Sequence, residues 1–422
     1  MPSPVTRRTV LAGGAAAAGL SLPGVKAFAG DRHRASVRFR LNSKVLDGGE
    51  QITSITLNTA DLGRIDPSSV TTETFRVHAK ATSPIPVAAA DAIFSEYDLD
   101  REVTDAYLDH RGNIVLELAY GEGEVGGGTL GYIAGKGRNV QLDLEYTVTQ
   151  NLLIERRNGR TITIETFVQG RLSNPEVDAF RYRVSDSGMN YRLFTPGRGR
   201  DSRGRGRPLV VWLHGGGEGG LLPDGYYDNE TPLRANRGAL GFATPRAQRI
   251  FGGAYVVAPQ STSFWIEDGP RFAPLIREII GDLVRRYPID TDRIYVVGCS
   301  NGGYMSLEMT NLYPNLFAAS VPICGVVDAR EPGGEALITD AELRAIDTPT
   351  WLVASRDDTT VPPEDNTVHA HDLIPDSLMT LYDHVVWKGY QFPGHWSWIY
   401  VARNDPSIDG THIWQWMADQ RR

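Results

Sequence analysis

Hydrophobic and polar residues alternate with a period of two in several short segments of the N-terminal half of the chain. The clearest of these segments are residues 36–41, 114–118, 140–146 and 161–167. Such alternation is typical of β-strands that bury one face and expose the other. Between residues 35 and 170 we therefore expect an all-β region, and the spacing of its strands predicts an immunoglobulin-like β-sandwich.

The pattern changes after Asn174 and Pro175. An opening hairpin is predicted at residues 180–184 and 191–194, and residues 272–284 are apolar on one face of a helix. Continuous apolar runs predict buried strands at residues 209–213, 254–258, 294–297, 318–323, 350–354 and 385–390. Buried strands that alternate with helices form a mostly parallel sheet flanked by helices. The predicted domains are a β-sandwich over residues 30–174 and this α/β domain over residues 175–422.

Residues 1–29 have the pattern of a twin-arginine export signal. Arg7 and Arg8 precede an apolar run rich in Ala and Gly, and Ala27-Phe28-Ala29 forms a cleavage site. The run is shorter than the roughly 20 residues of a membrane span, and Pro23 interrupts its end. We therefore expect a secreted protein that begins near Gly30 and has no membrane partner.

The apolar strand at residues 293–297 leads into Gly298-Cys299-Ser300-Asn301-Gly302, and a helical pattern follows at residues 304–312. Strand, Gly-x-Ser-x-Gly and helix in this order are typical of a nucleophile elbow. The small residues on either side of the serine relieve crowding in the sharp turn and leave its hydroxyl exposed. Ser300 is therefore the candidate nucleophile.

A serine hydroxyl needs a base within reach and an acid that orients the base. Of the nine histidines, His395 stands in a loop directly after the last predicted strand, where this architecture places the base. Asp358 follows the preceding strand in an Asp-x-x-Val-Pro pattern, so it is the preferred acid. Asp357 is the alternative, although it is expected to bond loop backbone or Arg356.

The tetrahedral intermediate of acyl transfer needs N–H donors for its oxyanion. The first is expected from Asn301, directly after the nucleophile. The second is expected from Gly216 or Gly217, because His214-Gly215-Gly216-Gly217 follows the strand at residues 209–213. Glycines permit the backbone angles that turn N–H groups toward a substrate.

The substrate pocket is harder to predict because loops build it. The candidates for its lining, which stand near the predicted mouth, are Gln260, Trp265, Trp396 and Trp398, although the tryptophans are equally plausible as core residues. The two cysteines, Cys299 and Cys324, end neighbouring predicted strands. A disulfide and two buried thiols are both compatible with this placement. No metal or cofactor is expected.

The net charge of −8 argues against a nucleic-acid partner. The basic run at residues 197–207 has no aromatic residues between its arginines, so it is interpreted as a solvated hairpin loop. The sequence predicts no oligomeric state.

The motifs at residues 214–217, 298–302, 358–362 and 394–398 give the chain a resemblance to the α/β-hydrolase superfamily. It is most similar to secreted EstA-type esterases, in which an immunoglobulin-like domain precedes a hydrolase domain like that of prolyl oligopeptidase. The resemblance implies a serine esterase that acts through an acyl-enzyme on short-chain or polymer-linked esters. The alternatives are a serine peptidase or amidase of the prolyl oligopeptidase type and an extracellular polyester (polyhydroxyalkanoate) depolymerase. A binding protein with an inert hydrolase domain is a third hypothesis.

Overall fold

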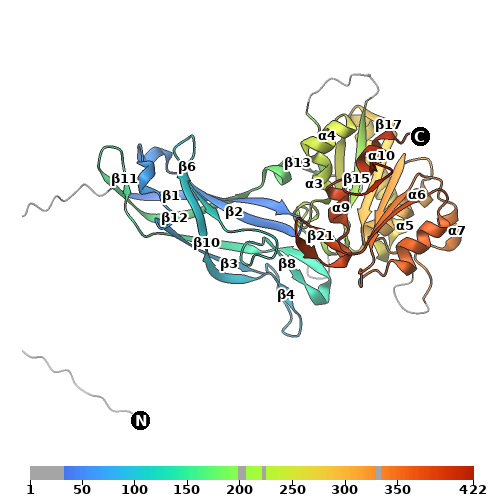
Figure 1. Ribbon diagram of the computed structural model, residues 1–422, viewed down its shortest axis with the longest axis horizontal. Coiled ribbons are helices and arrows are strands. Elements are labelled where there is room, and N and C mark those ends of the chain that lie inside the picture. Colours follow the sequence, from blue (N-terminus) through green and yellow to red (C-terminus); the bar gives the residue numbers. More distant parts are fainter. Residues whose placement is uncertain (1–32, 198–205, 221–224, 329–333) are drawn as a thin grey trace, which may run out of the picture.

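The computed structural model describes residues 33–197, 206–220, 225–328 and 334–422. An elongated N-terminal β-region (residues 33–173) and a more compact α/β region (residues 174–422) lie end to end (Figure 1). The predicted export signal at residues 1–29 and most of the predicted basic loop lie outside the described residues.

The N-terminal β-region is strand-rich, as the alternation predicts. β3 shows this alternation directly, because buried residues occupy every second position from Phe75. A six-stranded sheet has the order β11 (Ile154–Glu155), β12 (Thr161–Ser173), β1 (His33–Leu46), β2 (Gly49–Leu57), β7 (Ile114–Leu118) and β6 (Val103–Leu108). Two three-stranded sheets comprise β10 (Asp143–Gln150), β3 (Phe75–Thr82) and β5 (Tyr97–Arg101), and β4 (Ile93–Phe94), β8 (Leu130–Ile133) and β9 (Arg138–Gln141). Its likeness to an immunoglobulin domain stays a prediction.

The α/β region is built on an eight-stranded sheet whose first two strands form the predicted antiparallel hairpin. From β16 onward the paired strands of this sheet run parallel to one another, as the alternation of strands and helices predicts. Its order is β13 (Phe180–Val184), β14 (Asn190–Phe194), β16 (Tyr255–Pro259), β15 (Arg207–Leu213), β17 (Ile289–Cys299), β18 (Ala319–Ile323), β19 (Trp351–Ser355) and β20 (Leu378–Tyr382).

The prediction of the last strand was wrong. Residues 385–390 do not join the main sheet; β21 (Val385–Trp387) and β22 (Tyr390–Phe392) pair only with each other. The sheet ends instead with β20, which pairs with β19. β20 is an edge strand whose residues are all only partly buried, so it lacks the buried apolar run that reveals the inner strands.

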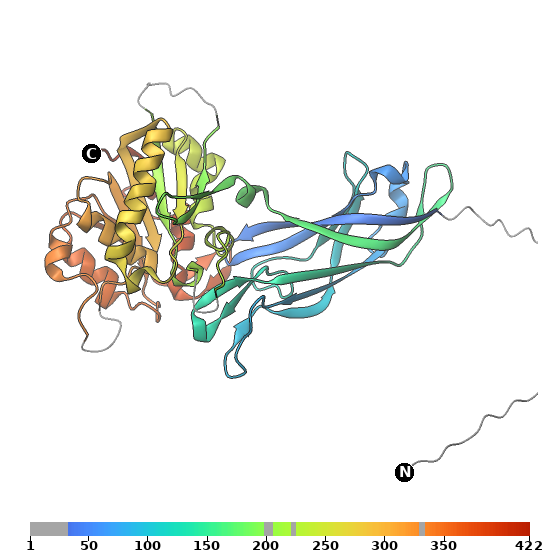
Figure 2. The ribbon, with the colours of Figure 1, turned by 180° about the vertical axis from the view of Figure 1, so that it is seen from behind.

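Helices cover both faces of the sheet (Figures 1 and 2). In β15, Leu209 and Val211 enter one hydrophobic cluster with Ile276 of α5, whereas Val210 and Trp212 enter the other. Burial on both faces explains the continuous apolar runs of these strands. The helices are α1 (Pro175–Asp178), α2 (Thr231–Arg234), α3 (Gly238–Ala243), α4 (Pro245–Phe251), α5 (Gly269–Arg286), α6 (Asn301–Leu312), α7 (Asp340–Arg344), α8 (His369–Leu373), α9 (Trp398–Ala402) and α10 (Ile413–Asp419). Within the described ranges, no helix combines the length and apolar character needed to cross a membrane.

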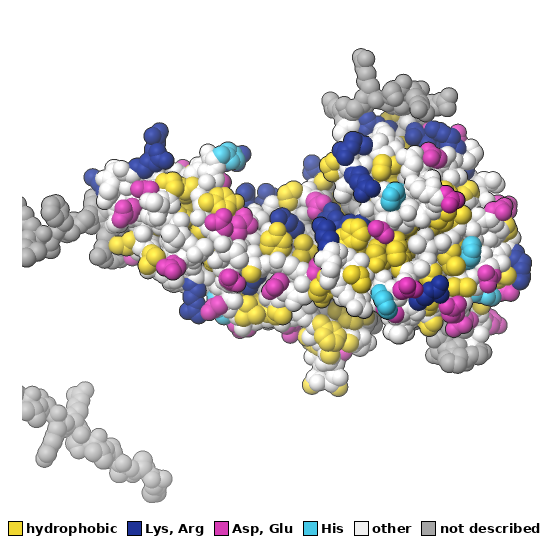
Figure 3. Space-filling view, viewed as in Figure 1, with side chains coloured by type: hydrophobic (Ala, Val, Ile, Leu, Met, Phe, Trp, Pro, Cys, Tyr) yellow, Lys and Arg dark blue, Asp and Glu magenta, His cyan; other side chains and the backbone are white. Residues whose placement is uncertain are grey.

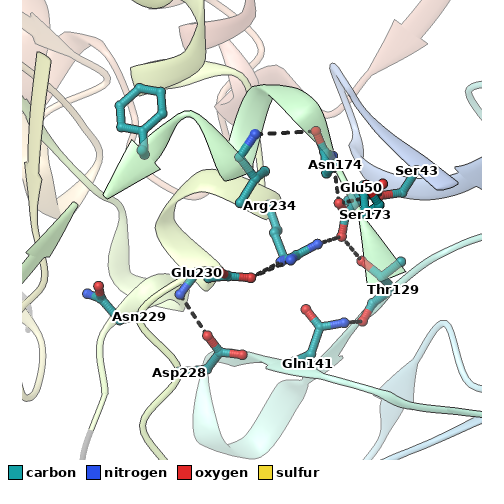
Figure 4. Close-up of polar contacts among 12 residues, drawn as sticks. Ser43, Glu50, Thr129, Gln141, Ser173, Asn174, Asp228, Asn229, Glu230 and Arg234 are labelled. Carbon is teal, nitrogen blue, oxygen red and sulfur yellow. Dashed lines mark hydrogen bonds and ion pairs between the residues drawn. The ribbon is translucent and has the colours of Figure 1, made fainter. Parts of the chain in front are cut away.

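A buried polar network joins the two regions (Figure 4). The Glu50 carboxylate of β2 is fully buried and forms an ion pair with Arg234 of α2. Glu50 Oε1 accepts hydrogen bonds from Ser43 Oγ at 2.7 Å and Asn174 Nδ2 at 2.6 Å, and Oε2 accepts one from Thr129 Oγ1 at 2.7 Å. A carboxylate with this many donors is held in one orientation, so the network sets how the β-region lies against the α/β region.

One further ion pair and one further hydrogen bond cross the same boundary. Arg403 donates two hydrogen bonds of 2.8 Å to the Asp47 carboxylate. Arg237 donates to both oxygens of Glu176 and to the carbonyl oxygen of Val45. The bidentate geometry adds directional constraint to the contact. The β-region is therefore fixed beside the site described below.

Candidate active site

The predicted elbow is a strained turn between β17 and α6. Ser300 lies between Cys299, the last residue of the strand, and Asn301, the first residue of the helix, with φ 53° and ψ −116°. A positive φ is uncommon for a residue with a side chain and marks sites where the surrounding structure imposes the conformation.

The glycines of the motif are required by space. A Cβ atom on Gly298 would lie 2.1 Å from the carbonyl oxygen of Gly302, and one on Gly302 would lie 2.0 Å from that of Leu213. Both obstacles are backbone atoms of packed elements, so neither can move away cheaply. This close packing of β17, β15 and α6 places Ser300 at the carboxyl edge of the sheet.

Replacing Gly302 by alanine is expected to lower the free energy of unfolding by about 3 kcal/mol or more, because the added methyl group overpacks the elbow. Thermal unfolding followed by circular dichroism measures the loss. Gly281→Ala is the matched control, since a Cβ there meets only the Arg285 side chain, at 3.4 Å, on α5. The control should keep or raise the melting temperature. An unchanged melting temperature in Gly302→Ala would show that the elbow can relax.

The predicted base and acid are in contact. His395 Nδ1 lies 2.7 Å from Asp358 Oδ2, and the Asp358 side chain is fully buried. Asp358 Oδ1 accepts hydrogen bonds from the backbone N–H groups of Thr360 and Val361, each at 2.9 Å. Because an ionised carboxylate only accepts hydrogen bonds, Nδ1 carries the proton of a neutral imidazole. Nε2 is then left free to act as a base.

The surroundings of His395 act on its pKa in opposite directions. Burial lowers the pKa of the imidazole, whereas the nearby Cys324 sulfur and the hydrogen bond to Asp358 raise it, and the net shift is upward. A raised pKa means that the site stabilises the imidazolium form. The imidazolium is the form that His395 adopts after it accepts a proton as a general base.

The neighbouring aspartate belongs to a different pair. Asp357 Oδ2 lies 2.9 Å from His384 Nδ1, and Asp357 also accepts a hydrogen bond from Ser355 Oγ. Of its two predicted partners, Arg356 instead pairs with Asp383. A hydrogen bond from the loop backbone is present and helps to lower the pKa of Asp357. His384 is 61% exposed, whereas His395 is 13% exposed. Of the four residues in these two pairs, His395 alone lines the cavity of Ser300.

The predicted oxyanion loop packs against Asn301. The loop forms a short 3₁₀ turn at Gly216–Glu218. A Cβ atom on Gly216 would lie 3.0 Å from Asn301 Nδ2, and one on Gly217 would lie 2.8 Å from Asn139 Nδ2. The structure thus brings Asn301, Gly216 and Gly217 to one wall beside Ser300.

His214 holds this loop from behind. Its Nδ1 donates to the carbonyl oxygen of Gly215 at 2.6 Å, and its Nε2 accepts from the Ser261 N–H at 3.0 Å. Burial lowers the pKa of the imidazole to about 4, so it is neutral at physiological pH. This histidine is a structural anchor of the loop.

Ser300 and His395 open into a cavity of about 900 Å³, which we call the Ser300 cavity. Trp396 and Trp398, two of the predicted pocket residues, line it. Sequence reasoning missed that the β-region supplies much of its wall. The lining residues that it did not predict include Phe94, Val125, Tyr132, Asn139, Glu218 and Phe264.

The other two predicted pocket residues lie behind the wall. Trp265 is fully buried and donates its indole N–H to the carbonyl oxygen of His214 at 3.0 Å. Gln260 Nε2 donates to the carbonyl oxygens of Glu218 at 2.9 Å and Asp228 at 2.7 Å. Neither lines the Ser300 cavity. Their polar groups are used to support the oxyanion loop, which is why they are turned away from the cavity.

The two cysteines are free, buried thiols. Of the two alternatives, the structure therefore contains the thiols and not the disulfide. Cys324 Sγ lies 3.3 Å from the carbonyl oxygen of His395, to which it donates a weak hydrogen bond. The thiol helps to hold the loop that carries the candidate base.

Comparisons with known proteins agree with this geometry. The prolyl oligopeptidase family matches residues 278–338, which include the elbow. Poly(3-hydroxyalkanoate) depolymerase C of Paucimonas lemoignei is 33% identical over 131 residues, which are 28% of each chain. Acetylxylan esterase A of Emericella nidulans is 31% identical over 101 residues, or 24% of this chain and 33% of the relative. The chain thus matches no more than a third of the length of these relatives.

Among solved structures, a thermostable esterase matches with a TM-score of 0.72 and 26% identity. The match covers 91% of this chain and 99% of the other, so it includes both the β-region and the α/β region. The α/β region therefore has the α/β-hydrolase fold, and the matches together indicate a serine hydrolase enzyme.

Proposed function

We propose that this protein is a secreted serine esterase that hydrolyses carboxylic esters through an acyl-enzyme. The observation that carries the proposal is the convergence of Ser300 and His395 on one cavity, with His395 Nδ1 held at 2.7 Å by the buried Asp358 carboxylate. Three groups far apart in the chain reach one place in the roles that acyl transfer requires.

In the proposed mechanism, Ser300 Oγ attacks the ester carbonyl carbon while His395 Nε2 takes the hydroxyl proton. The N–H groups of Asn301 and of Gly216 or Gly217 stabilise the oxyanion of the tetrahedral intermediate. The intermediate collapses to an acyl-serine, and the alcohol leaves with the proton from His395. Water activated by His395 then adds to the acyl-serine, and the acid leaves as Ser300 regains its proton.

The substrates are proposed to be short-chain or polymer-linked esters. Phe94, Val125 and Tyr132 line the cavity, and these residues are 57%, 75% and 40% exposed. Figure 3 shows hydrophobic side chains on the protrusion that carries β4 and β8, next to the α/β region. Exposed apolar groups around an active site suit an apolar polymer chain. This feature, with the match to a poly(3-hydroxyalkanoate) depolymerase, makes polyester depolymerisation the second candidate function.

The test is hydrolysis of p-nitrophenyl acetate, butyrate and octanoate by residues 30–422, beside the matched alanine p-nitroanilide and a poly(3-hydroxybutyrate) suspension. Ester turnover well above anilide turnover supports the esterase, and the rate series over the three acyl chains measures the pocket. Anilide turnover alone would replace the proposal by a serine peptidase or amidase, which the match to the prolyl oligopeptidase family supports. Clearing of the polymer would favour the depolymerase.

Secretion is proposed from residues 1–29 and is tested separately. The full chain expressed in a host with a twin-arginine pathway should appear outside the cytoplasm with Gly30 as its first residue. Arg7→Lys with Arg8→Lys should keep it inside. Export of the doubly substituted chain would contradict the twin-arginine assignment.

Asp358→Asn is expected to lower kcat by about ten-thousandfold, because the amide stabilises neither the correct tautomer nor the imidazolium of His395. Catalysis needs neutral His395, so kcat/KM rises with pH through its pKa. The Asp358 carboxylate raises this pKa, and its loss should therefore move the acid limb of the pH profile to lower pH. Asp357→Asn is the matched control and should keep kcat, because Asp357 pairs with the exposed His384. Equal losses in both variants would refute the assignment of Asp358.

A further inference from the structure

The Ser300 cavity carries negative charge, and His395 is the one side chain in its described wall that can carry a compensating positive charge. Its lining includes Asp47, Glu50, Glu96, Glu124 and Glu218, and it includes no lysine or arginine among the residues that the structure describes. Asp47 and Glu50 are neutralised from behind the wall by Arg403 and Arg234. The other three carboxyl groups have no ion pair in the described chain.

Glu218 lines the same cavity as Ser300 and His395. It belongs to the oxyanion turn, directly after Gly217, and its residue is 7% exposed. Asn139 Nδ2 donates to its Oε1 at 3.3 Å, whereas Oε2 is buried without a hydrogen-bond partner in the described chain. A buried carboxylate oxygen without a hydrogen-bond partner is unfavourable, and a nearby positive charge or hydrogen-bond donor stabilises it.

Aromatic side chains line the cavity next to the loop that carries this carboxylate. Phe264 packs against the loop, because a Cβ on Gly216 would lie 3.1 Å from its ring, and Tyr132 would lie 3.6 Å from a Cβ on Gly217. Trp396 and Trp398 line the same cavity. A carboxylate and several aromatic side chains in one cavity can bind ammonium groups, including quaternary ones, through charge and cation–π attraction.

We propose that Glu218 makes the Ser300 cavity selective for esters that carry a positively charged ammonium group near the scissile bond, over neutral esters of the same shape. Anionic esters are disfavoured by the same charge. This inference rests on the proposed esterase function and names the substrate class within it. At an effective dielectric constant of about 20, a cation about 8 Å from a carboxylate gains roughly thirtyfold in binding.

The protonation of Glu218 sets the assay conditions. Burial raises the pKa of this carboxyl, and its contacts with the loop backbone, His395 and Asn139 lower it. The effect of burial is larger, so the pKa is about 7. Assays at pH 8.5 therefore keep Glu218 ionised.

The experiment compares acetylcholine with 3,3-dimethylbutyl acetate, in which a tert-butyl group replaces the trimethylammonium group. Initial rates are measured by pH-stat titration at pH 8.5, and the ratio of the two kcat/KM values is the readout. A ratio taken within one variant cancels any general effect on the oxyanion loop. The wild type is expected to prefer acetylcholine by at least tenfold, and Glu218→Gln should reduce this ratio by at least fivefold.

Two further variants separate charge from structure. Glu218→Asp keeps the charge and should keep most of the preference. Glu308→Gln is the matched control. Glu308 is a largely buried carboxyl on α6, and burial also raises its pKa to about 7. Unlike Glu218, it does not line the cavity. Its ratio should equal that of the wild type.

A binding measurement makes the result independent of turnover. Choline and 3,3-dimethylbutan-1-ol are titrated against the tryptophan fluorescence, which reports on Trp396 and Trp398 in the cavity wall. A tighter Kd for choline that weakens in Glu218→Gln supports the inference. Equal affinities in the wild type, or a preference unchanged in Glu218→Gln, would overturn it. If no ester is hydrolysed, the esterase proposal fails, and the binding ratio still decides the charge preference.

Discussion

Ser300→Ala is expected to lower kcat for p-nitrophenyl acetate by roughly a millionfold, the loss typical of removing a serine nucleophile. Without Ser300 Oγ no acyl-enzyme forms, and only the residual acceleration from the oxyanion donors and substrate binding, about a thousand- to ten-thousandfold over water, remains. The positive φ of 53° at Ser300 is a property of the backbone and does not depend on the hydroxyl group. The elbow should therefore keep its fold in the alanine variant. Stopped-flow and long-time absorbance assays measure the rates. Covalent labelling by a fluorophosphonate, read by mass spectrometry, should be lost together with activity.

Ser320→Ala is the matched control for this substitution. Ser320 lies on β18, next to β17, is fully buried, and its hydroxyl has no hydrogen-bond partner in the described chain. Its removal should leave both turnover and labelling unchanged. Retained ester hydrolysis in Ser300→Ala would assign the nucleophile to another residue and would sink the mechanism proposed above.

The largest effect on stability is expected from Glu50→Gln. The substitution leaves Arg234 buried at the boundary between the two regions with only the half-buried Glu230 as a charge partner. Breaking a buried ion pair on one side costs about 3–5 kcal/mol, which corresponds to a fall of roughly 10 °C in melting temperature. Differential scanning calorimetry of the whole chain measures the shift.

A double substitution tests the cause of this loss. Glu50→Gln combined with Arg234→Met removes the uncompensated charge, so it should recover part of the melting temperature. Asp100→Asn is the comparison for a surface pair, because Asp100 contacts Arg76 where both side chains are exposed. It should leave the melting temperature unchanged. A double variant that is less stable than the single one would show that the hydrogen bonds around Glu50 matter more than its charge.

The elements near the nucleophile were predictable because local spacing encodes them. β17 and α6 both adjoin Ser300, and the glycines at residues 298 and 302 are demanded by contacts that form whenever such a turn forms. The continuous apolar runs of the inner strands follow from burial on both faces of the sheet. β20 escaped prediction because an edge strand is exposed to solvent along one side, which removes that signal.

The choice between Asp357 and Asp358 depended on a weak local pattern, and the structure separates the two by their partners. Their side chains leave one loop toward two different histidines, His384 and His395. Trp265 and Gln260 stand close in sequence to the predicted mouth, yet their hydrogen bonds draw them behind the oxyanion loop. Nothing in the spacing of the chain specifies on which side of a loop a side chain lies.

The sequence by itself determined the fold class of the α/β region, the elbow serine and the order of the candidate triad, because these depend on periodicity and on short-range turn chemistry. Only the tertiary structure decided the wall of the cavity. Tyr132, Asn139 and Glu218 meet there from two regions that the buried Glu50 network holds together. The charge and shape of the cavity depend on residues that are distant in the chain and come together only in the folded protein. A local sequence pattern does not specify which distant residues will be neighbours.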